Sequence, residues 1–212
     1  LLIFVIMLFV GGVNIMWFLA GGGALLALAP IIWTRFLDSY QRERIQVLFD
    51  PSIDPSARAV RWQMNRSLRM LQHGGVTGQG LRHGTMVQAG LLPAQHTDFI
   101  FSSAGEELGM LGCLLILLLL GAIIVRCVYV GIKSGNYMNR LICVGIAGML
   151  FAQVGVNVGM CLGVFPVVGL TLPFFSYGGS SIVTMFAAMG FVSGINMRPA
   201  PDSNARYIRP KY

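Results

Sequence analysis

The sequence is poor in charged residues and above all in acidic ones: 11% of its 212 residues are charged, and only 8 are aspartate or glutamate. A water-soluble domain with 55% hydrophobic residues would expose too much apolar surface. Charge is missing altogether from three stretches, residues 1–34, 108–125 and 141–197. Each is long enough for a membrane-spanning helix, which needs about 20 apolar residues. The composition therefore predicts a membrane protein.

Other absences exclude further classes. The net charge is +7, but the basic residues form no dense cluster with interleaved aromatics, so we expect no nucleic-acid binding. No Walker loop, zinc motif or Ser-His-Asp arrangement occurs. No initiator methionine, basic leader or cleavage site precedes the first apolar run, and we interpret the chain as a fragment of a longer protein. The cysteines lack the paired spacing of disulfides or metal knuckles, and we interpret them as packing residues: Cys113, Cys127, Cys143 and Cys161.

The pattern along the chain predicts an all-α, polytopic transmembrane helical bundle. Apolar runs and turn signals divide it into the end of a span at 1–10, a span at 15–36, a large loop at 37–97, spans at 98–130 and 141–164, a loop at 165–176, a span at 177–197 and a tail at 198–212. The basic link around Lys133 and Arg140 and the basic tail are predicted to be cytoplasmic, which makes the large loop extracellular. Within that loop, Val60, Met64 and Leu68 predict a basic amphipathic helix, lying on the membrane surface or against the rest of the loop.

Asp98 lies where the large loop turns into a span. A carboxylate at such a place often caps a helix N-terminus; alternatively, partial desolvation there can suit it to act as a general base. Glu106 and Glu107 follow about 12 Å further along the helix, where a carboxylate needs a cation or a polar cavity. The helical period leaves only Glu106 near the face of Asp98, so Glu106 could share its cavity, with a purely structural pairing as the alternative.

Two further segments could bind a ligand. Arg42 and Arg44 follow the first complete span, where an arginine fork suits phosphate but a snorkelling anchor is an equal alternative. Ser176, Gly178, Gly179 and Ser180 open the last span. A glycine pair at a helix start lets backbone amides approach an anion, whereas close packing of helices through small residues is the competing interpretation.

Taken together, these motifs resemble the SEDS family, which includes RodA, FtsW and SpoVE. They are Tyr-Gln-Arg-Glu-Arg at 40–44, Leu-Pro at 92–93, His-Thr-Asp-Phe-Ile-Phe at 96–101, Glu-Glu-Leu-Gly at 106–109, Asn-Val-Gly at 157–159 and the segment 166–181. Their order matches the C-terminal half of the family, so the resemblance implies a fragment of a protein with about ten spans.

The resemblance implies a peptidoglycan glycosyltransferase that polymerises lipid II, an undecaprenyl-pyrophosphate disaccharide-pentapeptide. It would work at the outer face of the bacterial cytoplasmic membrane, among membrane lipids and beside a class B penicillin-binding protein, in elongation, division or sporulation. A divalent cation, Mg²⁺ or Mn²⁺, would suit the pyrophosphate leaving group. The resemblance makes Asp98 the catalytic base and implies these substrate-binding residues: Arg42, Arg44, His96, Thr97, Glu106, Ser176, Gly178, Gly179 and Ser180.

Some positions depart from the family pattern, and two other functions stay open. Ala94 stands where the family usually has glutamate, and Gln79 replaces a lysine. The family's usual Gly-Tyr-Gln and Gln-Ser are here Val-Arg-Trp-Gln at 60–63 and Asn-Arg-Ser at 65–67. A lipid II flippase could use polar residues within spans, such as Gln153 and Asn157, and a non-catalytic scaffold could recruit a transpeptidase. A base at the outer boundary favours chemistry, because a transporter is expected to hold its ionisable groups near the midplane.

Overall fold

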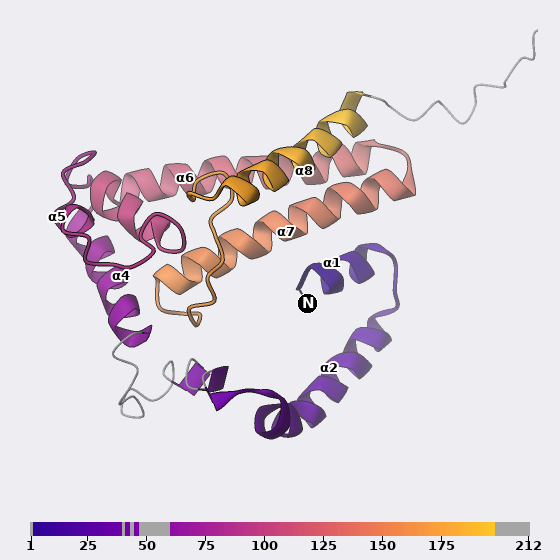
Figure 1. Ribbon diagram of the computed structural model, residues 1–212. Helices are drawn as coiled ribbons and strands as arrows, with labels where there is room; N and C mark the ends of the chain where they lie inside the picture. The colour runs from indigo at the N-terminus through magenta and orange to yellow at the C-terminus, as the bar shows by residue number, and fades with distance from the viewer. Residues whose placement is uncertain (1, 40, 43–44, 47–59, 198–212) are drawn as a thin grey trace, which may run out of the picture.

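The computed structural model describes residues 2–39, 41–42, 45–46 and 60–197 (Figure 1). Four segments in this part are long and apolar enough to cross a membrane, and the predicted all-α, multi-span fold is confirmed. The described helices are α1 (Leu2–Val10), α2 (Ile15–Ile31), the π-helical turn η1 (Ile32–Phe36), α4 (Val60–Gly74), α5 (Thr85–Gln88), α6 (Ile100–Lys133), α7 (Tyr137–Cys161) and α8 (Gly179–Met197).

The ends of the spans differ from the predicted ones by a few residues. The helix α6 begins at Ile100 and continues to Lys133, and α7 begins at Tyr137 instead of 141. The early start of α7 follows from capping, because the side chain of Asn136 accepts a hydrogen bond from the Met138 amide at 3.0 Å. Residues 47–59 of the large loop and the tail at 198–212 lie outside the described residues.

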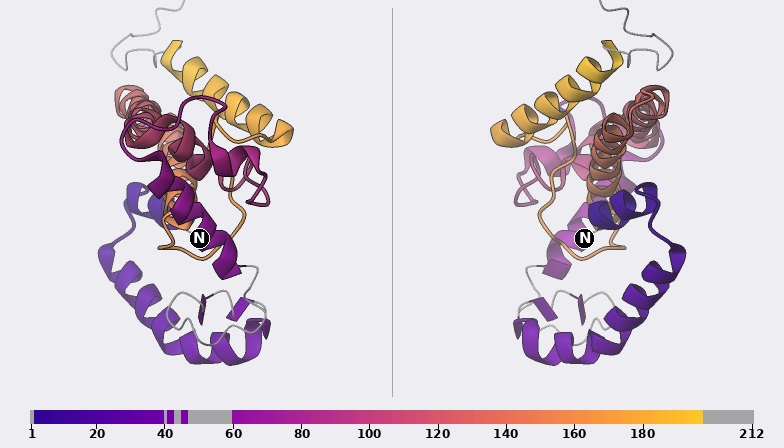
Figure 2. Two further views of the ribbon diagram at one scale, coloured as in Figure 1. Left: turned by 90° about the vertical axis from the view of Figure 1, so that its left-hand side faces the viewer. Right: turned by 90° about the vertical axis from the view of Figure 1, so that its right-hand side faces the viewer.

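The helices α6 and α7 form a long antiparallel pair, with α8 packed across it and α1 against α7 (Figures 1 and 2). All four cysteines are buried inside this assembly. Cys127 of α6, Cys143 of α7 and Met185 of α8 belong to one buried cluster. By contrast, α2 has no buried residue and curves away from the α6–α7 pair, so its apolar surface is exposed.

The amphipathic helix α4 packs on α6 and α7. Its Ser67 is fully buried, donates a hydrogen bond to the Cys161 carbonyl at 2.8 Å and lies 2.5 Å from the Ser102 hydroxyl oxygen. A Cβ on Gly74 would collide with the Gly105 carbonyl, so only glycine permits this approach of the two backbones. The sequence left this helix on the membrane surface or against the rest of the loop, whereas the structure packs it on the spans α6 and α7.

The helix α6 is broken at Gly109, whose φ of 69° lies in the left-handed region. A backbone group left unpaired in a bilayer costs several kcal/mol, so such a break needs partners from elsewhere. The loop after α4 supplies them through four backbone hydrogen bonds of 2.9–3.1 Å: Gln79 to Glu106, Gly80 to Glu107, Met110 to Gly75 and Leu111 to Val76. The break therefore joins the loop between α4 and α5 firmly to the span.

Candidate functional site

Asp98 lies on a turn of residues 94–99 that leads into α6, here called the Asp98 turn. The amides of Thr97, Asp98 and Phe99 all donate to the Ala94 carbonyl, at 3.1–3.3 Å. Ala94 has φ of 56°, a left-handed conformation that costs a non-glycine residue about 1 kcal/mol. Phe99 is 1% exposed and anchors the turn in the core. The turn is thus closed on one carbonyl and held by one buried ring.

The next four carbonyls of the turn are each bound by a donor from another part of the chain. The four bonds are the Ser103 hydroxyl to the Gln95 carbonyl at 3.1 Å, the Tyr177 amide to His96 at 2.9 Å, the Ser176 hydroxyl to Thr97 at 2.6 Å and the Asn157 side-chain amide to Asp98 at 2.8 Å. The donors belong to α6, α7 and the loop before α8. The backbone direction at Asp98 is therefore set by tertiary contacts and not by the turn alone.

Asn157 of α7 is central to this arrangement and is completely buried. Besides the Asp98 carbonyl, its Nδ2 donates to the Leu170 carbonyl at 2.6 Å, so one amide joins the Asp98 turn to the loop before α8. Its Oδ1 has no hydrogen-bond partner among the described residues. From the sequence, Asn157 was only a motif member and a polar residue within a span. The one signal of its role in the sequence is that a polar amide occurs inside an otherwise apolar span.

The carboxylate of Asp98 has no hydrogen bond or ion pair within the described part of the chain, and the residue is half-buried. Phe99 occupies the N-cap position of α6, and no side chain caps this helix end. The capping alternative for Asp98 is therefore wrong. The backbone of Gly169 passes close to the carboxylate, since a Cβ added there would lie 3.4 Å from Oδ2. The Asp98 carboxylate therefore has no bonded partner in the described part of the chain, and the nearby loop residue, Gly169, has no side chain to cover it.

Glu106 faces α5 and does not share a cavity with Asp98, contrary to expectation. It is completely buried, and both carboxylate oxygens accept hydrogen bonds from the start of α5. Oε1 accepts from the Thr85 hydroxyl at 3.3 Å and the Met86 amide at 2.8 Å, and Oε2 accepts from the Val87 amide at 3.0 Å. A carboxylate at a helix N-terminus pairs amides that lack an intrahelical acceptor. The geometry gives Glu106 a structural role in place of the predicted substrate contact.

Arg42 is not brought to the Asp98 turn either. Its Nε donates to the Leu37 carbonyl and its Nη2 to the Thr34 carbonyl, both at 2.9 Å, so it binds the carboxyl end of η1. Figures 1 and 2 show η1 apart from the α6–α7 pair. The anchoring alternative describes this contact better than phosphate binding does. Arg44 lies outside the described residues.

The start of α8 does lie at the Asp98 turn. The hydroxyl of buried Ser176 donates to Thr97 and accepts from the Leu172 amide at 2.7 Å, so it positions the turn and has no hydrogen left for a substrate. Gly178 precedes α8, and Gly179 and Ser180 form its exposed first turn. Because the first amides of a helix lack intrahelical partners, this end can receive an anion.

The remaining predicted contacts are the two residues before Asp98. His96 is exposed, with its Nε2 3.2 Å from the Gln95 side-chain nitrogen, and Thr97 is half-buried, with its hydroxyl donating to Ala94 at 3.3 Å. No group of three His, Cys, Asp or Glu residues that could hold a metal ion occurs in the described ranges.

Fold and site together define a class: a multi-pass helical membrane protein with a turn at the start of a span. Tertiary contacts hold the backbone of this turn, and its carboxylate has no partner in the described part of the chain. The model of the FtsW/RodA/SpoVE family, described as a cell cycle protein, matches residues 1–200. The chain belongs to this family, as the motif resemblance predicted.

Curated relatives support the same family. The chain is 38% identical to the peptidoglycan glycosyltransferase MrdB of Escherichia coli K12 over 89% of this chain and 50% of MrdB. It is 34% identical to the probable peptidoglycan glycosyltransferase FtsW of Bacillus subtilis, over 90% of this chain and 47% of that protein. The chain thus spans about half the length of the curated relatives it matches.

Two solved structures are similar to this one. A chain from a peptidoglycan synthase complex, studied for its coordination of polymerization and crosslinking, has a TM-score of 0.76 at 34% identity, covering 95% of this chain and 55% of the other. A mutant of the rod shape determining protein RodA of Thermus thermophilus has a TM-score of 0.50 at 39% identity, over 60% of this chain and 40% of the other. In both comparisons a similar fold is accompanied by sequence identity, 34% and 39%.

Proposed function

We propose that this protein is a peptidoglycan glycosyltransferase that polymerises lipid II, with Asp98 as its general base. The observation that carries the proposal is the contrast within the Asp98 turn. Four consecutive backbone carbonyls are held by donors from three segments, whereas the Asp98 carboxylate has no partner in the described part of the chain. Catalytic groups require such prior positioning, because a small misplacement costs orders of magnitude in rate.

In the proposed reaction, an Asp98 oxygen takes the proton from the 4-hydroxyl of the acceptor N-acetylglucosamine. The freed oxygen attacks the anomeric carbon of the growing strand, a C–O bond forms, and the bond to undecaprenyl pyrophosphate breaks. Asp98 ends protonated and returns its proton to solvent or to the leaving group. A positioned base of this kind contributes typically about 10²–10⁴-fold to rate.

The developing charge on the pyrophosphate needs donors, and the structure favours the start of α8 over Arg42. Tyr177 is bonded to the Asp98 turn, and α8 begins two residues later at Gly179. Its first amides lack intrahelical partners, and they are the proposed donors to an anion beside Asp98. A Mg²⁺ or Mn²⁺ ion would be held mainly by pyrophosphate oxygens and water, as Mg²⁺ usually is. The proposed reaction contains no step that depends on this ion.

The setting of this reaction is also proposed. The positive-inside rule supports an outward-facing Asp98 turn, and the proposed place of polymerisation is the outer face of the cytoplasmic membrane. A class B penicillin-binding protein is the proposed partner, and the similarity to a chain of a peptidoglycan synthase complex supports it. No observation favours elongation, division or sporulation over the others.

The test is polymerisation of labelled lipid II by the intact protein with its transpeptidase partner, comparing wild type with Asp98→Asn. Asp38→Asn is the matched control, because Asp38 is exposed, lies at the carboxyl end of η1 and has no side-chain partner in the described part. We expect strands from wild type and Asp38→Asn and none from Asp98→Asn. Normal strands from Asp98→Asn would refute the assignment of the base, and no strands from any folded protein would favour the flippase or the scaffold.

A further inference from the structure

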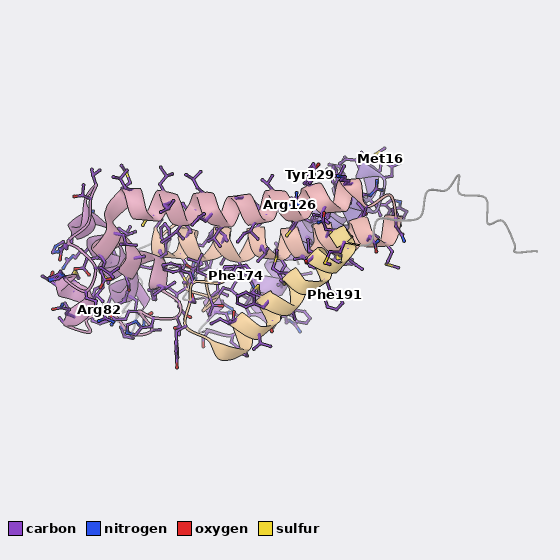
Figure 3. All side chains as sticks on the ribbon, turned by 90° about the horizontal axis from the view of Figure 1, so that it is seen from above. Met16, Arg82, Arg126, Tyr129, Phe174 and Phe191 are labelled. Atoms are coloured by element: carbon purple, nitrogen blue, oxygen red, sulfur yellow. The ribbon has the colours of Figure 1, made fainter. Side chains whose placement is uncertain are left out.

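Basic and aromatic side chains gather at the end of α6 opposite the Asp98 turn. Arg126, Tyr129 and Lys133 lie on one face of α6, since residues three and seven apart share a face, and all three are exposed. The Arg126 guanidinium is 5.4 Å from the centre of the Tyr129 ring, and Lys133 Nζ is 6.0 Å from it. Figure 3 shows Arg126 and Tyr129 at one end of the molecule and Arg82 at the other. These three residues are here called the basic stripe.

The basic stripe has no acidic counterpart on its own part of the chain. From residue 108 to residue 197 the sequence contains no aspartate or glutamate, yet it contains Arg126, Lys133 and Arg140. The carboxylates of α6, Glu106 and Glu107, precede its break at Gly109. Cations at a membrane surface without protein carboxylates are neutralised by anionic lipid headgroups. The charge pattern therefore calls for an external anion.

One hollow reaches the basic stripe at Lys133, and a second lies beside it along α8. A pocket of about 240 Å³ lies between the ends of α6 and α8 and is lined by Val130, Lys133, Ser134, Ile195 and Asn196. A larger groove of about 610 Å³ follows α8 and is lined mainly by apolar and small side chains, including Gly190, Phe191 and Gly194. Ile195 lines both hollows, so they adjoin at this residue, and Lys133 lines the smaller one.

The groove along α8 exists because two glycines leave it empty. A Cβ added to Gly190 or to Gly194 would meet no atom within 4 Å. Phe191, between them, is 67% exposed (Figure 3). An apolar channel with a basic pocket at its mouth matches a molecule with a hydrocarbon chain and a negatively charged head.

We propose that an anionic phospholipid binds here, with an acyl chain along the α8 groove and its phosphate at Lys133 and Arg126. Arg126 lies seven residues before Lys133, about 10 Å along the helix axis, and its long side chain can extend to the same headgroup level. Tyr129 suits the membrane–water interface between them. This lipid site is separate from lipid II polymerisation, because the basic stripe and the Asp98 turn lie at opposite ends of α6.

The test uses the intact protein in nanodiscs and a tryptophan reporter, Phe191→Trp, in a background in which Trp17, Trp33 and Trp62 are replaced by phenylalanine. Phosphatidylglycerol or phosphatidylcholine with brominated acyl chains is then added in equal fractions. We expect phosphatidylglycerol to quench the reporter more strongly. Each basic residue at a surface adds about fivefold to affinity for anionic lipid. Lys133→Gln and Arg126→Gln should therefore each raise about fivefold the phosphatidylglycerol fraction needed for half-maximal quenching.

Arg82→Gln is the matched control, an exposed arginine at the other end of the molecule (Figure 3). It should leave the quenching unchanged. Equal quenching by both lipids, or full selectivity for phosphatidylglycerol in the Lys133→Gln/Arg126→Gln double variant, would overturn the proposal. No quenching by either lipid would also overturn it, since the glycine spacing of α8 suits a covering helix as well. The readout needs no lipid II, so its failure is distinct from failure of the polymerase proposal.

Discussion

Replacing Asn157 with leucine tests whether the Asp98 turn depends on the side-chain amide that holds it. The substitution keeps the branched shape of the side chain, adds some volume, and removes the bonds to the Asp98 and Leu170 carbonyls, at 2.8 and 2.6 Å. Side-chain hydrogen bonds within membrane proteins are worth about 0.6 kcal/mol on average and up to about 1.7, so the two together give about 1–3 kcal/mol. If this loss raises the activation free energy because Asp98 is held less well in the transition state, kcat falls roughly 5- to 150-fold, since 1.36 kcal/mol corresponds to a tenfold change in rate.

The assay is the rate of labelled lipid II polymerisation by the intact protein, measured over a range of substrate concentrations, together with its thermal unfolding midpoint. A positioning residue should lower kcat with little change in KM, because it orients the base and does not touch the substrate. Asn157→Ser retains one donor and should fall between wild type and Asn157→Leu.

Gln153→Leu is the matched control for Asn157→Leu. Gln153 lies one turn earlier on α7, also carries an amide, and makes no side-chain hydrogen bond in the described part of the chain. We expect its kcat to stay near the wild-type value. A kcat for Asn157→Leu within about twofold of the Gln153→Leu value would refute the reasoning, because 0.4 kcal/mol is then about the most the contact contributes.

Three further predictions concern the same region. Glu106→Gln places an amide against the α5 donors and should destabilise the protein by about 1–2 kcal/mol in thermal unfolding; an unchanged midpoint would contradict the capping role. Ser176→Ala leaves the Thr97 carbonyl and the Leu172 amide unpaired and should lower kcat about tenfold in the polymerisation assay, and wild-type activity would show that the turn holds itself. Gly169→Ala adds strain at φ 75° and a methyl group beside Asp98, whereas the control Gly12→Ala adds similar strain at φ 81° with no atom within 4 Å. Polymerisation per folded protein should therefore fall for Gly169→Ala and stay near the wild-type value for Gly12→Ala.

The roles of the two carboxylates show where sequence reasoning failed. Capping was the alternative for Asp98, and a ligand contact was the expectation for Glu106, yet in the structure Glu106 caps a helix and Asp98 has no partner. Helical periodicity relates residues only along one continuous helix. Asp98 precedes α6, whose N-cap is Phe99, so the helical period does not relate it to Glu106. The loop between α4 and α5 returns to α6 through contacts distant in sequence, which place α5 against Glu106.

Composition determined the membrane class, and the charge-free runs along the sequence located the spans. A charge-free run of about 20 apolar residues is costly anywhere but in a bilayer. The motif at 96–101 also located the candidate base at the boundary of a span. Only the tertiary structure decided which polar groups are consumed by the fold. Asn157 and Ser176 donate to backbone carbonyls of other segments, and Glu106 accepts from backbone amides of α5, whereas the Asp98 carboxylate has no such partner in the described part of the chain. Hydrogen-bond partners are set by proximity in space and not along the chain.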